Sequence, residues 1–145
     1  MSQQITRTDT SVSTPPAARH FTVLLSATRK GARLARLLAT ERLRSWGLPF
    51  ETAALIISEL GANAALHGRV PGRNFRLTLR ATDDVLRIEV RDPCPERLPV
   101  VRLRGETNGE HGHGLLLVQE LADRWGVVPE LICKTVWAEL DLQPS

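Results

Sequence analysis

The chain has 145 residues, of which 42% are hydrophobic and 24% are charged, and its formal net charge is +3 at pH 7. This length supports one domain around a single hydrophobic core and is short for two domains. The basic residues are scattered among acidic ones and Tyr is absent. The composition therefore lacks the basic patch and the aromatic platform of nucleic-acid-binding proteins, and we expect no direct contact with nucleic acid.

The cysteines and the hydropathy of the chain indicate the cellular compartment of the protein. Cys94 and Cys133 lie far apart and outside any CxxC motif, which argues against a zinc site and against a disulfide framework. No apolar run approaches the roughly 20 residues that cross a bilayer, and the first residues lack the apolar centre of a signal peptide. We therefore expect a cytoplasmic protein with no membrane contact.

The chain begins with a polar segment that is followed by two regular elements. Residues 1–19 are rich in Ser, Thr, Gln and Pro, which predicts a disordered tail before a single domain at 20–145. Alternating apolar residues predict a strand over 20–28, and leucines at helical spacing predict a helix over 29–46.

Three arginines, Arg29, Arg33 and Arg36, line a separate side of this first predicted helix. Charged stripes of this kind usually face water, and we favour that interpretation over contact with an acidic partner or a phosphate. The helix is expected to end before Gly47.

A second helix is predicted between Leu48-Pro49 and Gly68, and it carries the polar residues Glu59, Asn63 and His67. Their spacing of four residues places them within an arc of about 80°. The same arc holds the large apolar residues Leu55, Ile56, Leu60 and Leu66. Burying polar groups among apolar ones without partners costs on the order of 1 to 3 kcal/mol each. A bound ligand would supply the partners; the alternative is that backbone groups satisfy these side chains or that they lie at the rim of the core.

Two alternating runs, residues 74–82 and 85–92, predict an antiparallel hairpin with one covered face. The period of two residues places Asp92 on the covered face, together with Leu86, Ile88 and Val90. An inward carboxylate at the end of a strand requires a hydrogen-bond donor. The alternative is that Asp92 caps a turn at Pro93.

Residues 93–112 contain several Pro and Gly residues without periodicity, which is typical of a lid or a binding loop. The segment ends in a glycine-rich stretch, 109–114, directly before a predicted helix at 115–125. A glycine-rich loop before a helix aims unpaired N–H groups at a phosphate, although it can also be a flexible connection. Two strands are predicted after the helix, at 126–128 and 131–142.

The order of these elements predicts an α+β fold, a two-layer α/β sandwich. Its sheet is expected to be mixed but mostly antiparallel, with three helices on one face and a polar, exposed opposite face. The candidate ligand groups are complementary. The amide oxygen of Asn63 suits Mg²⁺, the glycine-rich helix start suits phosphates, and the carboxylate of Asp92 suits the amino group of a purine. Together they predict a purine nucleotide site.

Three motifs carry a resemblance to a known family. ELGANAALHG at 59–68 resembles the N-box, Asp92 stands where the G1 box begins, and GEHGHGLLLV at 109–118 resembles the G2 box. These boxes belong to the Bergerat ATP-binding fold, the GHKL or HATPase_c class of gyrase, histidine kinases and mismatch-repair ATPases. Over about residues 20 to 142 the chain is similar to the single-domain anti-sigma-factor serine/threonine kinases of actinobacteria.

The resemblance implies ATP and Mg²⁺ as cofactors and a role for each matching residue. Asn63 would coordinate Mg²⁺, Asp92 would bind the adenine amino group, and Glu59 would act as the general base, with His67 in support at the edge of the pocket. The phosphates would be held by Gly109, Gly112, Gly114 and Leu115. The usual G1 box is Asp-x-Gly-x-Gly, whereas residues 92–96 contain no glycine, so the loop beside the adenine is expected to be stiffer.

The implied function is regulation of transcription by phosphorylation of a serine or threonine on a partner, an antagonist in an anti-sigma switch. The alternative is a non-catalytic, nucleotide-responsive module that sequesters a sigma factor or another regulator. Glu59 favours the first hypothesis, and the altered G1 loop favours the second. The catalytic part of a histidine kinase fits poorly, because no phosphoacceptor helix pair precedes this domain, and the resemblance leaves a homodimer open.

Overall fold

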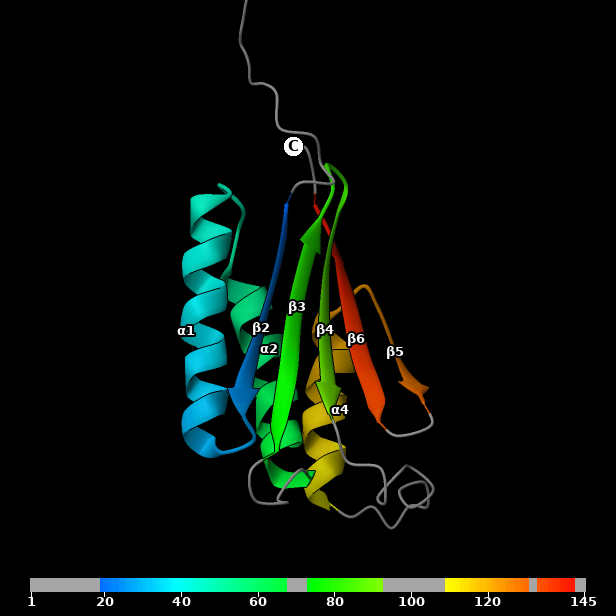
Figure 1. The fold of residues 1–145 in the computed structure, drawn as a ribbon. Helices are drawn as coiled ribbons and strands as arrows, with labels where there is room; N and C mark the ends of the chain where they lie inside the picture. The colour runs from blue at the N-terminus through cyan, green and yellow to red at the C-terminus, as the bar shows by residue number, and fades with distance from the viewer. Residues whose placement is uncertain (1–18, 68–72, 93–108, 131–132, 143–145) are drawn as a thin grey trace, which may run out of the picture.

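The computed structural model describes residues 19–67, 73–92, 109–130 and 133–142. Its elements are β2 (His20–Ser26), α1 (Arg29–Ser45), α2 (Glu51–His67), β3 (Asn74–Ala81), β4 (Val85–Asp92), α4 (Gly109–Leu121), β5 (Arg124–Pro129) and β6 (Lys134–Asp141). The described strands form one sheet in the order β2-β3-β4-β6-β5. Figure 1 shows the described helices gathered on one face of this sheet.

The predicted two-layer α+β sandwich is therefore confirmed. Each pairing among the described strands is antiparallel, where the sequence predicts a mixed, mostly antiparallel sheet. None of the described helices is both long and apolar enough to cross a membrane.

The hairpin of β3 and β4 supplies the centre of the core. Its register pairs Leu77 with Val90 and Leu79 with Ile88, and these four side chains are at most 2% exposed. Because side chains alternate along a strand, the covered face collects the apolar residues and the open face collects the charged ones. The predicted hairpin and its facing are confirmed.

Helix α1 begins at a well-formed cap on the end of β2. The Thr28 hydroxyl accepts a hydrogen bond from the Gly31 N–H at 3.0 Å, as expected of an N-cap residue. A Cβ atom at Gly31 would overlap the Ser26 carbonyl oxygen, so glycine allows the first turn to lie directly against the strand. The helix is followed by Gly47 with a positive φ of 74°, which matches the predicted stop.

The second and third helices differ from their predicted limits. Helix α2 begins at Glu51, so Pro49 lies before the helix; the Phe50 carbonyl accepts the first bond, from Ala54 N at 2.8 Å. Helix α4 spans Gly109–Leu121 and so begins earlier and ends earlier than predicted. Trp125 belongs to β5, where it pairs with Ala138, because sheet pairing takes over the chain directly after the helix.

The start of the domain also lies slightly earlier than predicted. The Arg19 guanidinium contacts the Asp83 carboxylate at 3.2 Å, and the Arg19 carbonyl accepts a hydrogen bond from Ala81 N at 3.0 Å. Arg19 is thus part of the folded domain rather than of the tail. The remainder of the predicted tail, residues 1–18, lies outside the described residues.

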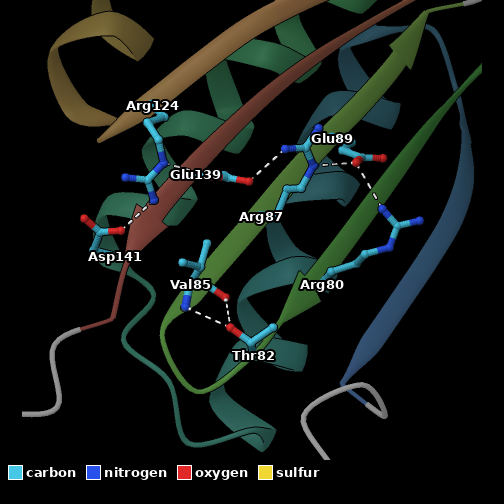
Figure 2. Close-up of polar contacts among 8 residues, drawn as sticks. All are labelled: Arg80, Thr82, Val85, Arg87, Glu89, Arg124, Glu139 and Asp141. Atoms are coloured by element: carbon cyan, nitrogen blue, oxygen red, sulfur yellow. Dashed lines mark hydrogen bonds and ion pairs between the residues drawn. The ribbon is translucent and has the colours of Figure 1, made fainter.

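The open face of the sheet carries a ladder of ion pairs, shown in Figure 2. Arg87 donates to Glu89 at 2.7 Å and to Glu139 at 2.8 Å. Arg124 donates to Glu139 at 2.9 Å and to Asp141 at 2.6 Å. Hydrogen bonds from Arg124, and then from Arg87, lower the pKa of Glu139. The predicted polar face is confirmed, and its charges neutralise one another.

Candidate functional site

Three elements that are distant in the sequence meet at one end of the sandwich. Figure 1 shows the C-terminal end of α2, the C-terminal end of β4 and the N-terminal end of α4 together at the bottom of the view. Helix α2 packs against both β4 and α4. The structure thus gathers the segments that carry the predicted site residues at a common end.

Asp92 is the last residue of β4, and its side chain is only 3% exposed. Its position continues the inward series of Leu86, Ile88 and Val90, as the alternation predicts. Carboxylates are seldom buried this deeply, because removing a charge from water is costly. A buried carboxylate at the end of a strand, beside a helix with further polar groups, is suited to receiving a donor from a ligand.

Glu59 and Asn63 lie one turn apart on α2, and both are half-buried. The buried face of the helix passes through Ile56 and Leu60, both at most 1% exposed. Because 59 and 63 follow these positions by three residues, they border the buried face. The structure therefore places them at the rim of the core, the alternative that the sequence left open, where a ligand can reach them.

The apolar residues of α2 that are buried in the structure differ from those that the sequence predicts to be buried. Leu55 and Leu66 are 51% and 46% exposed and do not point at the core. The buried face is instead completed by small residues, and Gly61 lies against Ala32 of α1, since a Cβ on Gly61 would sit 3.3 Å from the Ala32 Cβ. The close approach of α1 turns α2 so that its small side is buried and two leucines face outward.

The glycine-rich segment does not form the predicted loop, because Gly109, Gly112 and Gly114 lie within the first turns of α4. The helix forms there despite a penalty of roughly 1 kcal/mol per glycine. The first N–H groups of the helix have no partner within it, and they carry the positive end of the helix dipole. Leu115 is half-buried and packs against the core, which anchors this helix start.

Two further predictions fall partly or wholly outside the described residues. His67 is the final residue of α2, but its side chain is not among the described ones. The predicted lid is described only from Gly109 onward, so Cys94 and the altered G1 loop lie outside as well.

The chemistry of the described donors bears on which metal they could hold. Within the described ranges no group of three or more His, Cys, Asp or Glu side chains could hold a metal ion, which argues against an all-protein cage there. Mg²⁺ is commonly held by one or two protein groups together with substrate phosphates. A half-buried amide oxygen on Asn63 fits that mode of binding.

A polar cluster that the sequence did not predict lies across the ends of β4 and β6. Arg91 Nε donates to Cys133 Sγ at 2.9 Å, and the Cys133 thiol donates to Glu130 at 3.1 Å. Burial raises the pKa of the Cys133 thiol, and the hydrogen bond from Cys133, followed by Arg91, lowers the pKa of Glu130. The alternation of β4 does place Arg91 on the face opposite Asp92, but no sequence signal joins it to Cys133.

Comparisons with known proteins agree with the fold. The family model described as histidine kinase-like ATPase domain matches residues 25–139. No curated protein matches the chain. A solved structure of the RsbU and RsbW domains of Rv1364c from Mycobacterium tuberculosis matches with a TM-score of 0.64 and 21% sequence identity.

That match covers 87% of this chain and 33% of the other, so this chain spans about a third of the solved protein. At this identity the likeness shows the fold, which is the same sandwich. The family model covers most of the domain, including α2, β4 and α4. The chain belongs to the histidine kinase-like ATPase domain family.

Proposed function

We propose that this domain binds ATP with Mg²⁺ and transfers the γ-phosphoryl group to a serine or threonine of a protein partner. The observation that carries the proposal is the buried carboxylate of Asp92, 3% exposed, at the end of a strand that packs against α2. A carboxylate accepts a hydrogen bond from the amino group of adenine, and it would repel the carbonyl oxygen that guanine has at the same ring position.

The remaining binding roles follow from the elements around Asp92. The N–H groups at the start of α4 would hold the phosphates, because a helix N-terminus favours anions. Asn63 would hold Mg²⁺, which when bound neutralises charge on the phosphates. We expect His67, at the end of α2, to support the edge of the pocket.

Glu59 is the candidate general base for the transfer. Its half-buried position keeps it near the site and still reachable by a hydroxyl from outside. As the hydroxyl oxygen forms its bond to the γ-phosphorus, the bond from that phosphorus to the bridging oxygen breaks and ADP leaves. Glu59 would accept the hydroxyl proton, a role that typically contributes about 10² to 10⁴ in rate.

The motif resemblance and the RsbW-like fold support an anti-sigma type of regulator, whose partner is a sigma factor or an antagonist protein. A buried, reduced thiol at Cys133 suits the cytoplasm. A non-catalytic, nucleotide-responsive module is the second candidate, and the absence of glycine from residues 92–96 favours it.

Transfer of labelled phosphate separates the two candidates. The protein would be incubated with Mg²⁺, ATP labelled at the γ-position and a panel of purified antagonist proteins that carry serine. We expect label on one antagonist that survives acid treatment, as a phosphate ester of serine or threonine does. Tight ATP binding without any transfer would favour the non-catalytic module, and acid-labile label would indicate a phosphorylated histidine and contradict the proposal.

A further inference from the structure

A groove of about 550 Å³ runs between α1 and α2, and its lining residues, among those that the structure describes, all belong to these two helices. Figure 1 shows the two helices side by side in the helical layer, and they pack directly against each other. The floor includes Ala62, Ala65 and Leu66 of α2. Ala62 is exposed and Leu66 is 46% exposed, so the floor is an apolar surface in contact with water.

Three arginines, Arg29, Arg33 and Arg36, form the α1 side of the groove. All three are exposed, and none takes part in an ion pair with another described residue. No acidic residue of the described ranges lines the groove. This concentration of positive charge contrasts with the open face of the sheet, where Arg87 and Arg124 each bind two carboxylates.

The arginine stripe is unfavourable for the isolated helix. Arg29 lies in the first turn of α1, which contains no acidic residue, and a positive charge there opposes the helix dipole. The spacing of four residues from Arg29 to Arg33 and three from Arg33 to Arg36 makes them like-charged neighbours, which repel. Helix stability therefore does not explain why arginine stands at these positions.

We propose that the groove between α1 and α2 docks an acidic amphipathic helix of a partner protein. Arg29 and Arg36 are separated by seven residue steps along α1, about 10 Å at 1.5 Å per residue, and so the arginines match carboxylates that recur along two turns of a facing helix. The small residues of the floor allow a second helix to approach closely, and its apolar ridge would cover Leu66. Helix-in-groove recognition combines these features.

The apolar floor of the groove favours a helix over a nucleic acid as its occupant. A phosphate backbone would use the arginines but would leave the floor uncovered, and no aromatic side chain among the described lining residues offers stacking to a base. The α2 residues that line the groove are Ser58, Ala62, Ala65 and Leu66 and do not include Glu59 or Asn63, and the test of the groove requires no nucleotide. The proposal therefore stands independently of the proposed function.

Fluorescence anisotropy with a designed peptide tests the proposal. The probe is a labelled helical peptide of about 20 residues, long enough to be helical in water, with a Leu/Ala ridge flanked by Glu. Its control is an isomer of the same composition in which Glu interrupts the ridge. We expect the first peptide to bind and the isomer to bind about tenfold more weakly or not at all.

Three variants locate the binding. The double variant Arg33→Glu, Arg36→Glu should lower the affinity for the peptide about tenfold, because each exposed ion pair contributes about 2- to 5-fold in affinity. Lys30→Glu, on the same helix but outside the groove, reverses one charge in the same sense and should change binding less than twofold. Ala62→Trp should abolish binding, because the larger side chain fills the groove without changing its charge.

Thermal unfolding of the same variants separates docking from folding. The Arg33→Glu, Arg36→Glu variant should be about as stable as the wild type, because the change at position 33 turns its repulsion from Arg29 into attraction, while positions 33 and 36 remain like-charged. The proposal would be overturned if the two peptides bound equally, if Lys30→Glu lost as much peptide affinity as the double arginine variant, or if Ala62→Trp bound the peptide like the wild type. Duplex DNA that binds as tightly as the peptide and responds to the same variants would assign the groove to nucleic acid and would overturn it as well.

Discussion

On the open face of the sheet, acidic and basic side chains from β3, β4, β6 and β5 neutralise one another, whereas the covered face buries one carboxylate, Asp92, among the described residues. The open-face charges are accounted for by the fold, because each described member of the ladder has a partner within 3.0 Å. The carboxylate of Asp92 is instead 3% exposed, and it lies at the end of the sheet where α2 and α4 converge (Figure 1).

Pairing and burial distinguish structural from functional charged side chains in this domain. A charged side chain that is paired on a solvated surface contributes a little stability, typically about 0 to 1 kcal/mol. A charged side chain buried at the meeting point of several elements is expensive and is usually retained for binding or catalysis. Variants on the two faces should therefore change different properties, stability on the open face and nucleotide chemistry on the covered face.

The largest contrast is expected between two glutamates. Glu59→Gln removes the proposed general base and should slow phosphoryl transfer by about 10² to 10⁴, while ATP affinity stays within about twofold. Glu89→Gln, a matched change on the open face, should leave the transfer rate intact. Rates of label transfer to the partner under saturating ATP measure both. An equal effect of the two substitutions, or loss of ATP binding in Glu59→Gln, would show that Glu59 is structural.

The second contrast concerns Asp92. Asp92→Asn should weaken ATP by about 10- to 100-fold, the equivalent of roughly 1.5 to 3 kcal/mol for a charged hydrogen bond. It should also narrow the preference for ATP over GTP, because an amide can donate to the guanine carbonyl. Asp141→Asn on the open face should change neither quantity. Titration calorimetry with both nucleotides measures them, and equal ATP affinities for the two variants would contradict the role of Asp92.

A smaller effect is expected at Asn63. Asn63→Ala should remove most of the gain in ATP affinity that Mg²⁺ provides, about tenfold or ~1.4 kcal/mol, and should leave the affinity measured with a chelator unchanged. The chelator serves as the internal control, since both proteins then bind without metal. If the variant responds to Mg²⁺ as strongly as the wild type, the metal is held elsewhere.

The smallest effect is expected on the open face itself. Glu139→Gln removes partners of both Arg87 and Arg124 and should lower the free energy of unfolding by about 1 kcal/mol at pH 7, or roughly 2–4 °C in Tm. The pKa of Glu139 is lowered from its ordinary value of 4.5. Its stabilisation is therefore complete above that value and is lost as the pH falls through the lower folded-state pKa.

Thermal unfolding of wild type and Glu139→Gln between neutral and acidic pH measures this dependence. The difference in Tm should be largest near pH 7 and should shrink below the ordinary pKa of 4.5. A difference that grows on acidification would mean that folding raises the pKa of Glu139 instead of lowering it. The ATP affinity of Glu139→Gln should be unchanged, because Glu139 contributes to stability and not to nucleotide binding.

The strands and the first helix could be predicted from sequence because their signals are local. Alternation defined the hairpin and the inward position of Asp92, and Gly47 marked the end of α1. The start of helix α4 was predicted too late because glycines disfavour a helix locally, whereas the helix includes them from Gly109 onward. Its predicted end was also too late, since the pairing of Trp125 with Ala138 depends on a strand much later in the chain.

The sequence predicted which side of α2 the candidate site residues share, but not how deeply they are buried. Periodicity placed Glu59 and Asn63 on one side of α2, but it could not show that Gly61 and Ala32 bring α1 close and turn Leu55 and Leu66 outward. The same close approach creates the groove beside Arg33, so the arginine stripe could be seen in the sequence and its concave setting could not.

Calorimetric titration of the full chain with ATP and GTP, each with Mg²⁺ and with a chelator, tests the nucleotide site most directly. We expect one ATP to bind per chain, about tenfold or more tighter than GTP because Asp92 selects the adenine amino group, and to bind more weakly when Mg²⁺ is removed. Equal affinities for ATP and GTP, or no heat of binding for ATP at millimolar concentration, would contradict this expectation.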